Sequence, residues 1–362
     1  MKFKTAIKPY QAAAGGWGSL EATTRFVFDS KQVLKNMRNL MRMNKAKGFD
    51  CPGCAWGDDN KSTFSFCENG AKAVTWEATR RFIDASFFAQ HSVSALYKQS
   101  DYFLEYQGRL TEPLRYNRET DHYEPISWDD AFALIARHIK AMDNPDQMEL
   151  YTSGRASNEA SWLYQLFGRM NGSNNFPDCS NMCHEASGTG LKRSIGVGKG
   201  TIRLDDFDHA DAIFVFGQNP GTNHPRMMGT LHELARRGVP IIVFNPLRER
   251  ALERFADPQS VVEMATLGST DIASTYFQVK AGGDAAALKG IAKHLLERED
   301  AVGNTLDREF IAQHTLNFED FADDIRATSW TSIEQESGLP RASLEQVAQA
   351  YAKSRATIIT YG

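Results

Sequence analysis

The order of apolar and polar residues predicts an α/β fold most clearly between positions 211 and 246. Residues 211–217 are a short apolar run that ends in glycine, as expected for a strand buried on both faces. A polar loop over 218–224 precedes a helix predicted from Pro225 to Arg237, which Gly238 ends. The run 240–244 predicts the next strand, so this segment is a βαβ unit with parallel strands.

The same pattern predicts further strands and helices on both sides of this unit. Residues 148–152 predict a strand, followed by a helix over 157–170. A helix over 285–297 follows the loop 280–284, and residues 355–362 predict a last strand. We therefore expect doubly wound, Rossmann-like αβα domains with a parallel sheet.

The N-terminal third has a weaker pattern. Residues 1–28 look irregular, whereas 29–44 predict a basic amphipathic helix that packs through Val33, Met37, Leu40 and Met41. Ser127 is a good N-cap for a later helix. The predicted buried face of that helix consists of Trp128, Ala131, Phe132, Ile135 and Ile139.

Composition excludes several classes of protein. The 362 residues carry a formal net charge of −4, which gives no basic footprint for nucleic acid. No apolar run approaches the ~18 residues of a membrane span. The N-terminus resembles no signal peptide, so we expect a cytoplasmic protein whose five cysteines serve metal or redox chemistry.

Three of these cysteines are spaced as in a metal site. Cys51-Pro-Gly-Cys54 places two thiols on one turn, and Cys67 returns a third. Three thiolates plus one other ligand suit zinc, whereas an iron–sulfur cluster needs a fourth ligand. Asp58 stands where a C-x2-C-x3-C motif has its third cysteine, and a carboxylate can ligate iron. A redox pair and incidental core cysteines are the alternatives.

Cys183 and His184 form the second candidate centre. A thiol next to an imidazole is either a nucleophile with its base or a soft metal ligand beside a proton carrier. The alternative is that Cys183 is a small buried hydrophobe. Neighbouring residues of an extended chain point to opposite sides, which disfavours direct thiol–imidazole catalysis. Cys179, in the same stretch, has only a structural interpretation.

Glycine-rich and polar loops follow several predicted strands. Ser153-Gly154 precedes a helix, as phosphate-binding turns do, although most α/β turns contain glycine. The loops that begin at Gly217, at Asn245 and at Gly282 follow the other strands. Open parallel sheets bind ligands beyond the carboxyl ends of their strands, so these loops predict a ligand-binding edge.

Together these motifs resemble molybdopterin-dependent oxidoreductases related to formate dehydrogenase, in particular the formate dehydrogenase H-like enzymes with an N-terminal G-G-W-G extension. The resemblance covers nearly the whole chain and corresponds to about the first half of such enzymes. It is carried by C-P-G-C with a later C-x-x-G, S-W-D-D, T-S-G-R-A-S-N-E, D-C-S-N-M-C-H, G-Q-N-P-G-T-N-H-P and K-A-G-G-D-A-A.

The resemblance implies cofactors and roles. Cys183 stands where the family has its molybdenum ligand, and His184 where formate dehydrogenases have a proton acceptor. The implied cofactors are molybdenum bis(molybdopterin guanine dinucleotide) and a [4Fe-4S] cluster. A small anion such as formate would reduce Mo(VI) to Mo(IV), and electrons would pass to an unknown acceptor protein or quinone-linked partner. The implied cofactor-binding residues are Ser153, Gly154, Gly217, Asn219, Pro220, Asn245, Pro246, Gly282, Gly283 and Asp284.

The sequence departs from the family pattern in three places. Asp58 replaces the third cluster cysteine, so a complete cluster is not implied. Asn69 replaces a lysine that relays electrons from cluster to pterin, and Lys72 is a possible substitute. The family's active-site arginine and its C-terminal cofactor-binding domain have no counterpart up to Gly362.

These observations predict a domain order. We expect an extension over 1–50, an iron–sulfur-type domain over 51–101, the first part of an α/β domain over 102–178 and a second, molybdopterin-binding α/β domain over 179–350. Residues 351–362 would return to the first α/β domain. The alternatives to a molybdenum oxidoreductase are a non-catalytic zinc- or partner-binding α/β protein and an inactive fragment of such an enzyme.

Overall fold

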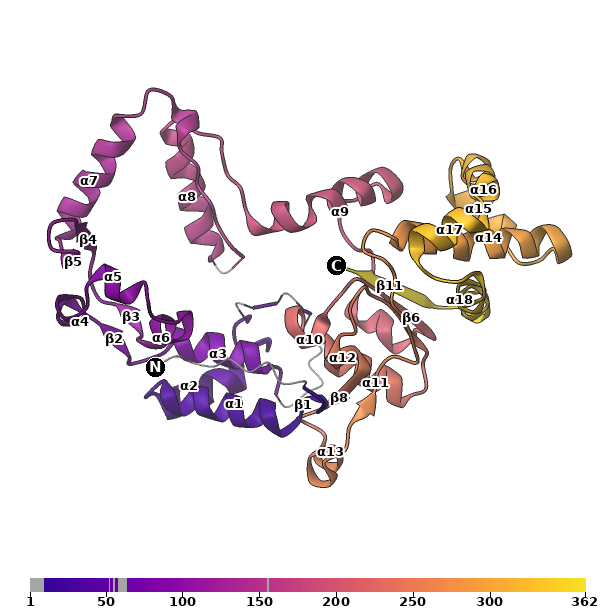
Figure 1. Cartoon of the computed structure of the whole chain (residues 1–362), viewed down its shortest axis with the longest axis horizontal. Coiled ribbons are helices and arrows are strands. Elements are labelled where there is room, and N and C mark those ends of the chain that lie inside the picture. The colour runs from indigo at the N-terminus through magenta and orange to yellow at the C-terminus, as the bar shows by residue number, and fades with distance from the viewer. Residues whose placement is uncertain (1–9, 52, 55, 58–63, 155) are drawn as a thin grey trace. The chain divides into compact units, whose positions relative to one another are not determined.

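The computed structural model describes residues 10–51, 53–54, 56–57, 64–154 and 156–362 (Figure 1). The chain divides into two compact units. Unit 1 comprises Met1–Glu21, Cys54–Ser62 and Ile202–Gly362, and unit 2 comprises Ala22–Gly53 and Thr63–Thr201. Asp58 lies outside the described residues. No described helix combines the length and apolarity that a passage through the bilayer requires.

Unit 1 is built on a four-stranded parallel sheet. Its strands lie in the order β10 (Thr275–Phe277), β7 (Ile241–Phe244), β6 (Ala212–Phe216) and β11 (Thr357–Tyr361). In chain order this is 3-2-1-4, so the winding reverses between β6 and β11. The parallel sheet confirms the predicted α/β fold and the βαβ unit around positions 211–246.

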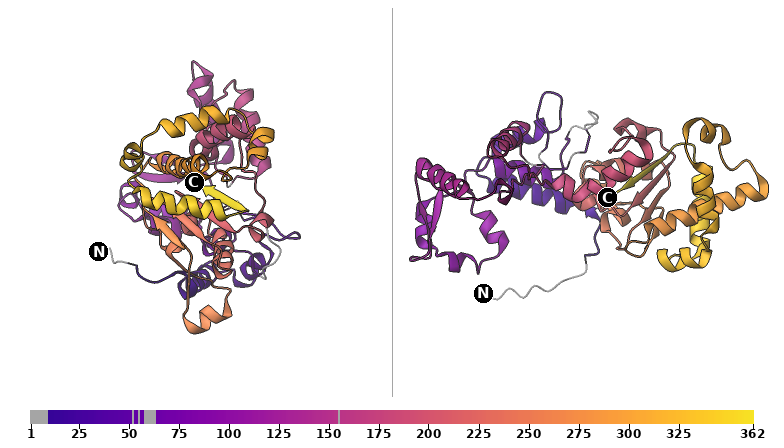
Figure 2. Two further views of the ribbon diagram at one scale, coloured as in Figure 1. Left: turned by 90° about the vertical axis from the view of Figure 1, so that its right-hand side faces the viewer. Right: turned by 90° about the horizontal axis from the view of Figure 1, so that it is seen from above.

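Helices cover both faces of this sheet, which explains why its central strands β6 and β7 are apolar throughout (Figure 2). On one face, Ile213 and Val215 of β6 pack with α11 (Met227–Arg236). On the other, Phe214 and Phe216 pack with three helices: α14 (Asp284–Val302), α17 (Trp330–Ser337) and α18 (Arg341–Lys353). Predicted helices over 225–237 and 285–297 thus correspond to α11 and α14.

The crossovers of unit 1 carry shorter elements. A second sheet has the order β1 (Ala14–Gly15), β8 (Arg254–Ala256) and β9 (Thr270–Asp271). Gly15 has a φ of +81°, and a Cβ there would lie 2.5 Å from the carbonyl oxygen of Ala256, so only glycine fits. The remaining elements are η2 (Leu204–Asp208), α10 (Pro220–Asn223), α12 (Arg250–Glu253), α13 (Val261–Thr266), α15 (Arg308–His314) and α16 (Phe318–Ala327).

Unit 2 has a small core in which Val27, Leu40, Met43, Ala71 and Val74 pack together. β2 (Phe82–Ile83) pairs with β3 (Arg109–Leu110), and β4 (Leu114–Asn117) with β5 (His122–Pro125). Its helices are α2 (Val33–Arg42), α3 (Glu68–Glu77), α4 (Ala85–Gln90), α5 (Val93–Leu96), α6 (Asp101–Tyr106), α7 (Trp128–Lys140), η1 (Pro145–Gln147), α8 (Asn158–Met170) and α9 (Cys179–Ile195).

The N-terminal expectations need correction. Residues 16–28, expected to be irregular, form most of helix α1 (Gly16–Asp29), and the basic helix over 29–44 is shortened to α2. Glycine-rich composition suggested flexibility, but the indole Nε1 of Trp17 donates to the carbonyl of Met264 at 2.9 Å and fixes the start of α1. The strand expected over 148–152 is reduced to one bridge between Thr152 and Asp178.

Helix α7 begins as predicted, because the Ser127 hydroxyl accepts the N–H of Asp130 at 3.0 Å. Its predicted buried face is wrong for this structure. Trp128, Phe132 and Ile135 are 63%, 60% and 53% exposed. The described strands of unit 2 form only two-stranded pairs, and none of them covers this face.

The last strand also differs from expectation. Residues 351–362 were assigned to the first α/β domain, whereas β11 pairs with β6 over five residues from Thr357 to Tyr361. The carboxylate of Asp211 accepts the backbone N–H groups of Arg355 and Ala356 at 3.0 and 3.1 Å, which fixes the start of β11 beside β6. The other domain boundaries stay predictions.

A buried histidine network ties α13 to α11. The Nε2 of His232 lies 2.8 Å from Oε1 of Glu263, which also accepts the Thr270 hydroxyl at 2.6 Å. The other carboxylate oxygen accepts the N–H of Asp257 at 2.7 Å. Burial favours the neutral acid, but hydrogen bonds from His232, Thr270 and Asp257 outweigh it and hold the pKa of Glu263 below its usual value.

A glycine-to-alanine pair tests the packing of α14. A Cβ at Gly290 would lie 2.5 Å from Leu344 Cδ1 and 2.9 Å from Ile333 Cγ2. Overpacking costs about 1–3 kcal/mol, more than the ~1 kcal/mol that alanine gains in helix propensity. We expect Gly290→Ala to lower the free energy of unfolding in denaturant titrations. Gly229→Ala on α11, where a Cβ meets nothing within 4 Å, should raise it.

The Glu263 network predicts a pH dependence. A carboxyl whose pKa is lowered by folding contributes stability above its unfolded pKa of about 4.3, and loses it as pH falls through the lowered value. Glu263→Gln should therefore cost about 1–3 kcal/mol at neutral pH, and the difference from wild type should shrink at acid pH. Glu233→Gln, at an exposed position of α11, is the control. Equal losses at both pH values would contradict this account.

Candidate functional site

The carboxyl ends of the parallel strands of unit 1 form the first part of the site. Gly217 follows β6 with a φ of +67°, and its N–H donates to the carbonyl of Phe244 at 2.8 Å. A Cβ on Gly217 would lie 2.9 Å from the carbonyl oxygen of Gly362, which follows β11. Gly217 therefore lies at the point where the winding of the sheet reverses, which is where open α/β sheets bind ligands.

Asn245 joins the loop after β7 to the loop after β6. It is 4% exposed, and its amide donates to the carbonyl of Gln218 at 3.1 Å. Its side-chain oxygen accepts the N–H of Leu247 at 2.9 Å. Asn219 makes a second link by donating to the Glu249 carboxylate at 2.8 Å. The predicted residues Gly217, Asn219, Pro220, Asn245 and Pro246 thus belong to one pair of linked loops.

Tyr276 of β10 fixes the second of these loops. Its hydroxyl donates to the carbonyl of Leu247 at 2.6 Å and accepts the N–H of Glu249 at 2.9 Å. Burial raises the pKa of Tyr276, so the hydroxyl keeps the proton that it donates. Sequence reasoning missed Tyr276 and Glu249 because neither belongs to a recognisable motif.

The third loop follows β10. The N–H of Lys280 donates to the carbonyl of Ser337 at 2.9 Å, and the N–H of Gly283 donates to the carbonyl of Lys280 at 2.8 Å. A Cβ on Gly283 would lie 2.7 Å from the carbonyl of Glu336, so the approach requires glycine. Gly282 has a φ of +81°, and Asp284 opens α14.

Two buried acceptors at this edge lack hydrogen-bond donors within the described part of the chain. They are Oε1 of Gln218 and Oδ1 of Asp284. The Gln218 side chain lies against Gly362, since a Cβ there would meet Gln218 Cγ at 2.8 Å. Buried acceptors are normally paired, so these two oxygens fit a ligand that brings N–H or O–H groups. Gln218 was missed as a site residue from sequence.

In unit 2, the loop Ser153-Gly154 lies beside the start of α9. The N–H of Gly154 donates to the Cys179 thiol at 3.2 Å, and Thr152 bridges to Asp178. Cys179 thus has a structural contact, and Cys183 lies one turn further along α9. Residues at i and i+4 of a helix share a face, so Cys183 is on the side of α9 that carries Cys179.

Cys183 and His184 are both exposed, so Cys183 is not the buried hydrophobe of the alternative interpretation. They lie within a helix, which corrects the expected extended backbone. Consecutive helical residues still do not face each other, so direct thiol–imidazole catalysis remains geometrically disfavoured.

The cysteines near the start of unit 2 gather around one glycine. Cys67 is the N-cap of α3, and its thiol accepts the N–H of Gly70 at 3.4 Å. A Cβ on Gly70 would lie 3.1 Å from Sγ of Cys51. Asn44 supports this turn by accepting the N–H of Cys51 at 2.8 Å. Glycine at position 70 therefore lets two thiols approach the same helix N-terminus.

Two of the predicted cluster cysteines, Cys51 and Cys67, belong to unit 2. Cys54 belongs to unit 1, and the described residues contain no group of three His, Cys, Asp or Glu side chains arranged for a metal ion. Lys72, the possible relay residue, has its ammonium 4.1 Å from the centre of the Trp76 ring, in a cation–π contact. The role of Cys51, Cys54 and Cys67 in binding a cluster stays a prediction.

Comparison with known proteins identifies the family. The sequence model described as molybdopterin oxidoreductase matches residues 109–301, more than half of the chain. The chain belongs to the molybdopterin oxidoreductase family. The match includes α9 with Cys183 and the loops after β6, β7 and β10, and it confirms the resemblance stated above. The family implies a molybdenum–pterin cofactor and oxidoreductase chemistry.

Several relatives are similar over most of this chain. Protein YdeP of Escherichia coli is 48% identical over 365 residues, covering 99% of this chain and 48% of that protein. An uncharacterized oxidoreductase of Mycobacterium tuberculosis is 42% identical over 358 residues, which cover 98% of this chain and 46% of that protein. The chain thus spans about half the length of these relatives.

More distant similarity concerns the fold and the type of enzyme. Formate dehydrogenase H of Escherichia coli is 28% identical over 259 residues, covering 70% of this chain and 33% of the enzyme. The solved structure of acetylene hydratase from Pelobacter acetylenicus matches this chain with a TM-score of 0.53 and 18% identity. The match covers 68% of this chain and 30% of the hydratase chain. At this identity the structural match supports the fold alone.

Asn245 offers a test of the linked loops. Asn245→Ala leaves the carbonyl of Gln218 and the N–H of Leu247 without their partner, and a buried group left unpaired costs about 1–3 kcal/mol. We expect that loss in the free energy of unfolding. Asn223→Ala, at an exposed position of neighbouring α10, should change it by less than about 0.5 kcal/mol. Equal effects of the two substitutions would show that Asn245 does not link the loops.

Proposed function

We propose that the chain forms part of a molybdenum-dependent oxidoreductase of formate dehydrogenase type, which oxidises formate or a similar small anion. The observation that carries the proposal is the exposed thiol of Cys183 on α9, inside the segment that matches the family. A thiolate is a soft ligand suited to a heavy transition metal. When bound, the molybdenum–pterin group supplies a two-electron acceptor.

The chain's own residues have separate tasks in this proposal. Cys183 would hold the metal through Sγ, and His184 would take up the substrate's proton at an imidazole nitrogen. Ser153 and Gly154 lie beside the start of the same helix, where they contribute to binding a pterin phosphate.

The carboxyl edge of the sheet in unit 1 binds the guanine dinucleotide parts of the cofactor. Gly217, Asn219 and Pro220 with Asn245 and Pro246 form one side, and Gly282, Gly283 and Asp284 form the other. The buried, unpaired oxygens of Gln218 and Asp284 support this assignment, because guanine and ribose bring the N–H and O–H donors that such acceptors need.

We further propose that Cys51, Cys54 and Cys67 bind an iron–sulfur cluster that passes electrons to a redox partner. The support is the approach of Cys51 and Cys67 to Gly70 at the N-terminus of α3, where backbone N–H groups stabilise thiolates. The fourth ligand is open: Asp58 is the candidate from its spacing.

Metal analysis tests the proposal directly. The complete protein, isolated from cells supplied with molybdate, should contain molybdenum and iron and absorb visible light through its iron–sulfur centre. Zinc alone, in a colourless protein, would contradict the proposal and favour the non-catalytic alternative.

A pair of cysteine variants tests the metal ligand. Cys183→Ser should reduce formate-dependent turnover by more than about 100-fold, since one directly bound ligand is lost, while iron content stays unchanged. Cys179→Ser, one turn earlier on α9, keeps an acceptor for the N–H of Gly154 and should keep turnover. Unchanged turnover in Cys183→Ser, measured on metal-loaded enzyme, would overturn the assignment.

A further inference from the structure

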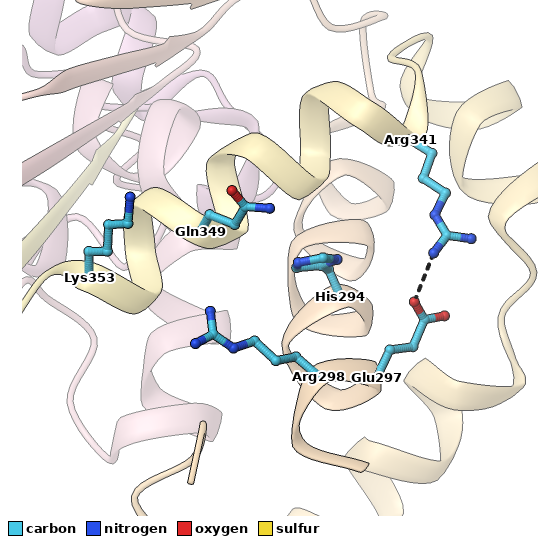
Figure 3. A pocket seen from close by; sticks show the side chains of 6 residues that line it. All are labelled: His294, Glu297, Arg298, Arg341, Gln349 and Lys353. Carbon is cyan, nitrogen blue, oxygen red and sulfur yellow. Dashed lines mark hydrogen bonds and ion pairs between the residues drawn. The ribbon is translucent and has the colours of Figure 1, made fainter. Parts of the chain in front are cut away.

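A groove with unused positive charge lies between α14 and α18, on the face of unit 1 that the β10–β11 crossover covers (Figure 3). Its volume is about 360 Å³, which is within the usual range of small-molecule pockets, about 300–1,000 Å³. The lining residues are His294, Glu297, Arg298, Arg341, Gln349 and Lys353.

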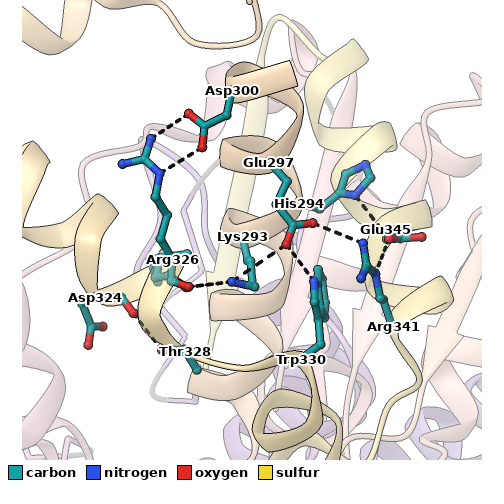
Figure 4. A network of polar contacts seen from close by, with 11 residues as sticks. Lys293, His294, Glu297, Asp300, Asp324, Arg326, Thr328, Trp330, Arg341 and Glu345 are labelled. Carbon is teal, nitrogen blue, oxygen red and sulfur yellow. Dashed lines mark hydrogen bonds and ion pairs between the residues drawn. The ribbon is translucent and has the colours of Figure 1, made fainter. Parts of the chain in front are cut away.

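The carboxylates near this groove already have cationic partners (Figure 4). Glu297 accepts Arg341 Nη2 at 3.2 Å and the Trp330 indole at 2.9 Å, and the Lys293 ammonium lies 3.9 Å away. Glu345 accepts Arg341 Nε at 2.6 Å, with a ring nitrogen of His294 at 3.6 Å. Neither carboxylate is left to neutralise the rest of the groove.

The other half of the groove holds donors without acceptors. Arg298, Lys353 and Gln349 make no side-chain hydrogen bond or ion pair with any residue of the described chain. Figure 3 shows Arg298 reaching from α14 toward the part of α18 that carries Gln349 and Lys353, with the ends of the three side chains apart from one another. All three side chains are exposed. The groove therefore carries two cations, Arg298 and Lys353, without a protein counter-charge among the described residues, and both would attract an anion that binds there.

We propose that this groove binds a small anion that carries phosphoryl groups. A guanidinium fork, an ammonium and a carboxamide N–H group complement the several oxygens of a phosphate, and arginine is suited to bind two of them at once. The alternative is that Lys353 only stabilises the C-terminus of α18 through the helix dipole. That account leaves Arg298 and Gln349 unexplained, and it predicts no ligand.

Inorganic pyrophosphate is a suitable probe. We expect pyrophosphate to raise the melting temperature of the full chain by more than sodium chloride of equal ionic strength does. We also expect it to bind in calorimetric titration. Arg298→Gln and Lys353→Gln should each weaken pyrophosphate binding by about 10-fold or more, the worth of one charge-assisted contact. Arg236→Gln, an exposed arginine in the last turn of α11, is the matched control and should bind as wild type.

Gln349→Glu provides an independent check. It places a carboxylate between the two cations, so the melting temperature without ligand should rise while pyrophosphate binding is lost. Adenosine diphosphate tests whether the phosphoryl group belongs to an inorganic anion or to a nucleotide. If both ligands bind, the groove accepts inorganic and nucleotide anions alike. If the nucleotide alone binds, the site is restricted to nucleotides. Equal affinity in wild type and all groove variants, or a response to chloride as large as to pyrophosphate, would overturn the proposal.

Discussion

The burial of the two central strands, β6 and β7, on both faces is the constraint on which the rest of unit 1 depends. Every side chain of β6 and β7 is buried and apolar, so the polar side chains of the sheet belong to the flanking strands β10 and β11. The parallel strands all end on the same side of the sheet, because each crossover carries the chain back to the side where the strands begin. Beside the central strands, polar residues are therefore found in the loops at the carboxyl ends, as with Asn245.

This constraint is why much of the fold and part of the site could be predicted from the sequence. An uninterrupted apolar run such as 212–216 fits only a strand buried on both sides, and the glycine after it marks the point where the chain turns. The loops at Gly217, Asn245 and Gly282 follow from strand direction alone. Gln218 could not be predicted as a site residue in this way. Its side chain lies against Gly362, which follows a strand far along the chain.

Contacts between distant segments also explain the failed expectations. Ala12–Gly18 has the composition of a flexible segment, yet Gly15 pairs with β8 and Trp17 donates to Met264, so a helix begins there. The apolar face of α7 had a clear helical period but has no sheet against it within the described chain. Periodicity shows which residues share a face, and only the tertiary structure shows what that face contacts.

Helix α14 carries two different polar positions, which argues for two different ligands in unit 1. At its first residue, Asp284 presents a buried acceptor without a donor. Arg298 lies fourteen residues later, about 21 Å along the axis at 1.5 Å per residue, and is an exposed cation without a protein acceptor among the described residues. A ligand rich in N–H and O–H groups matches the first position, and an anion matches the second. The two positions lie at different places along α14, so the groove between α14 and α18 is separate from the carboxyl edge of the sheet.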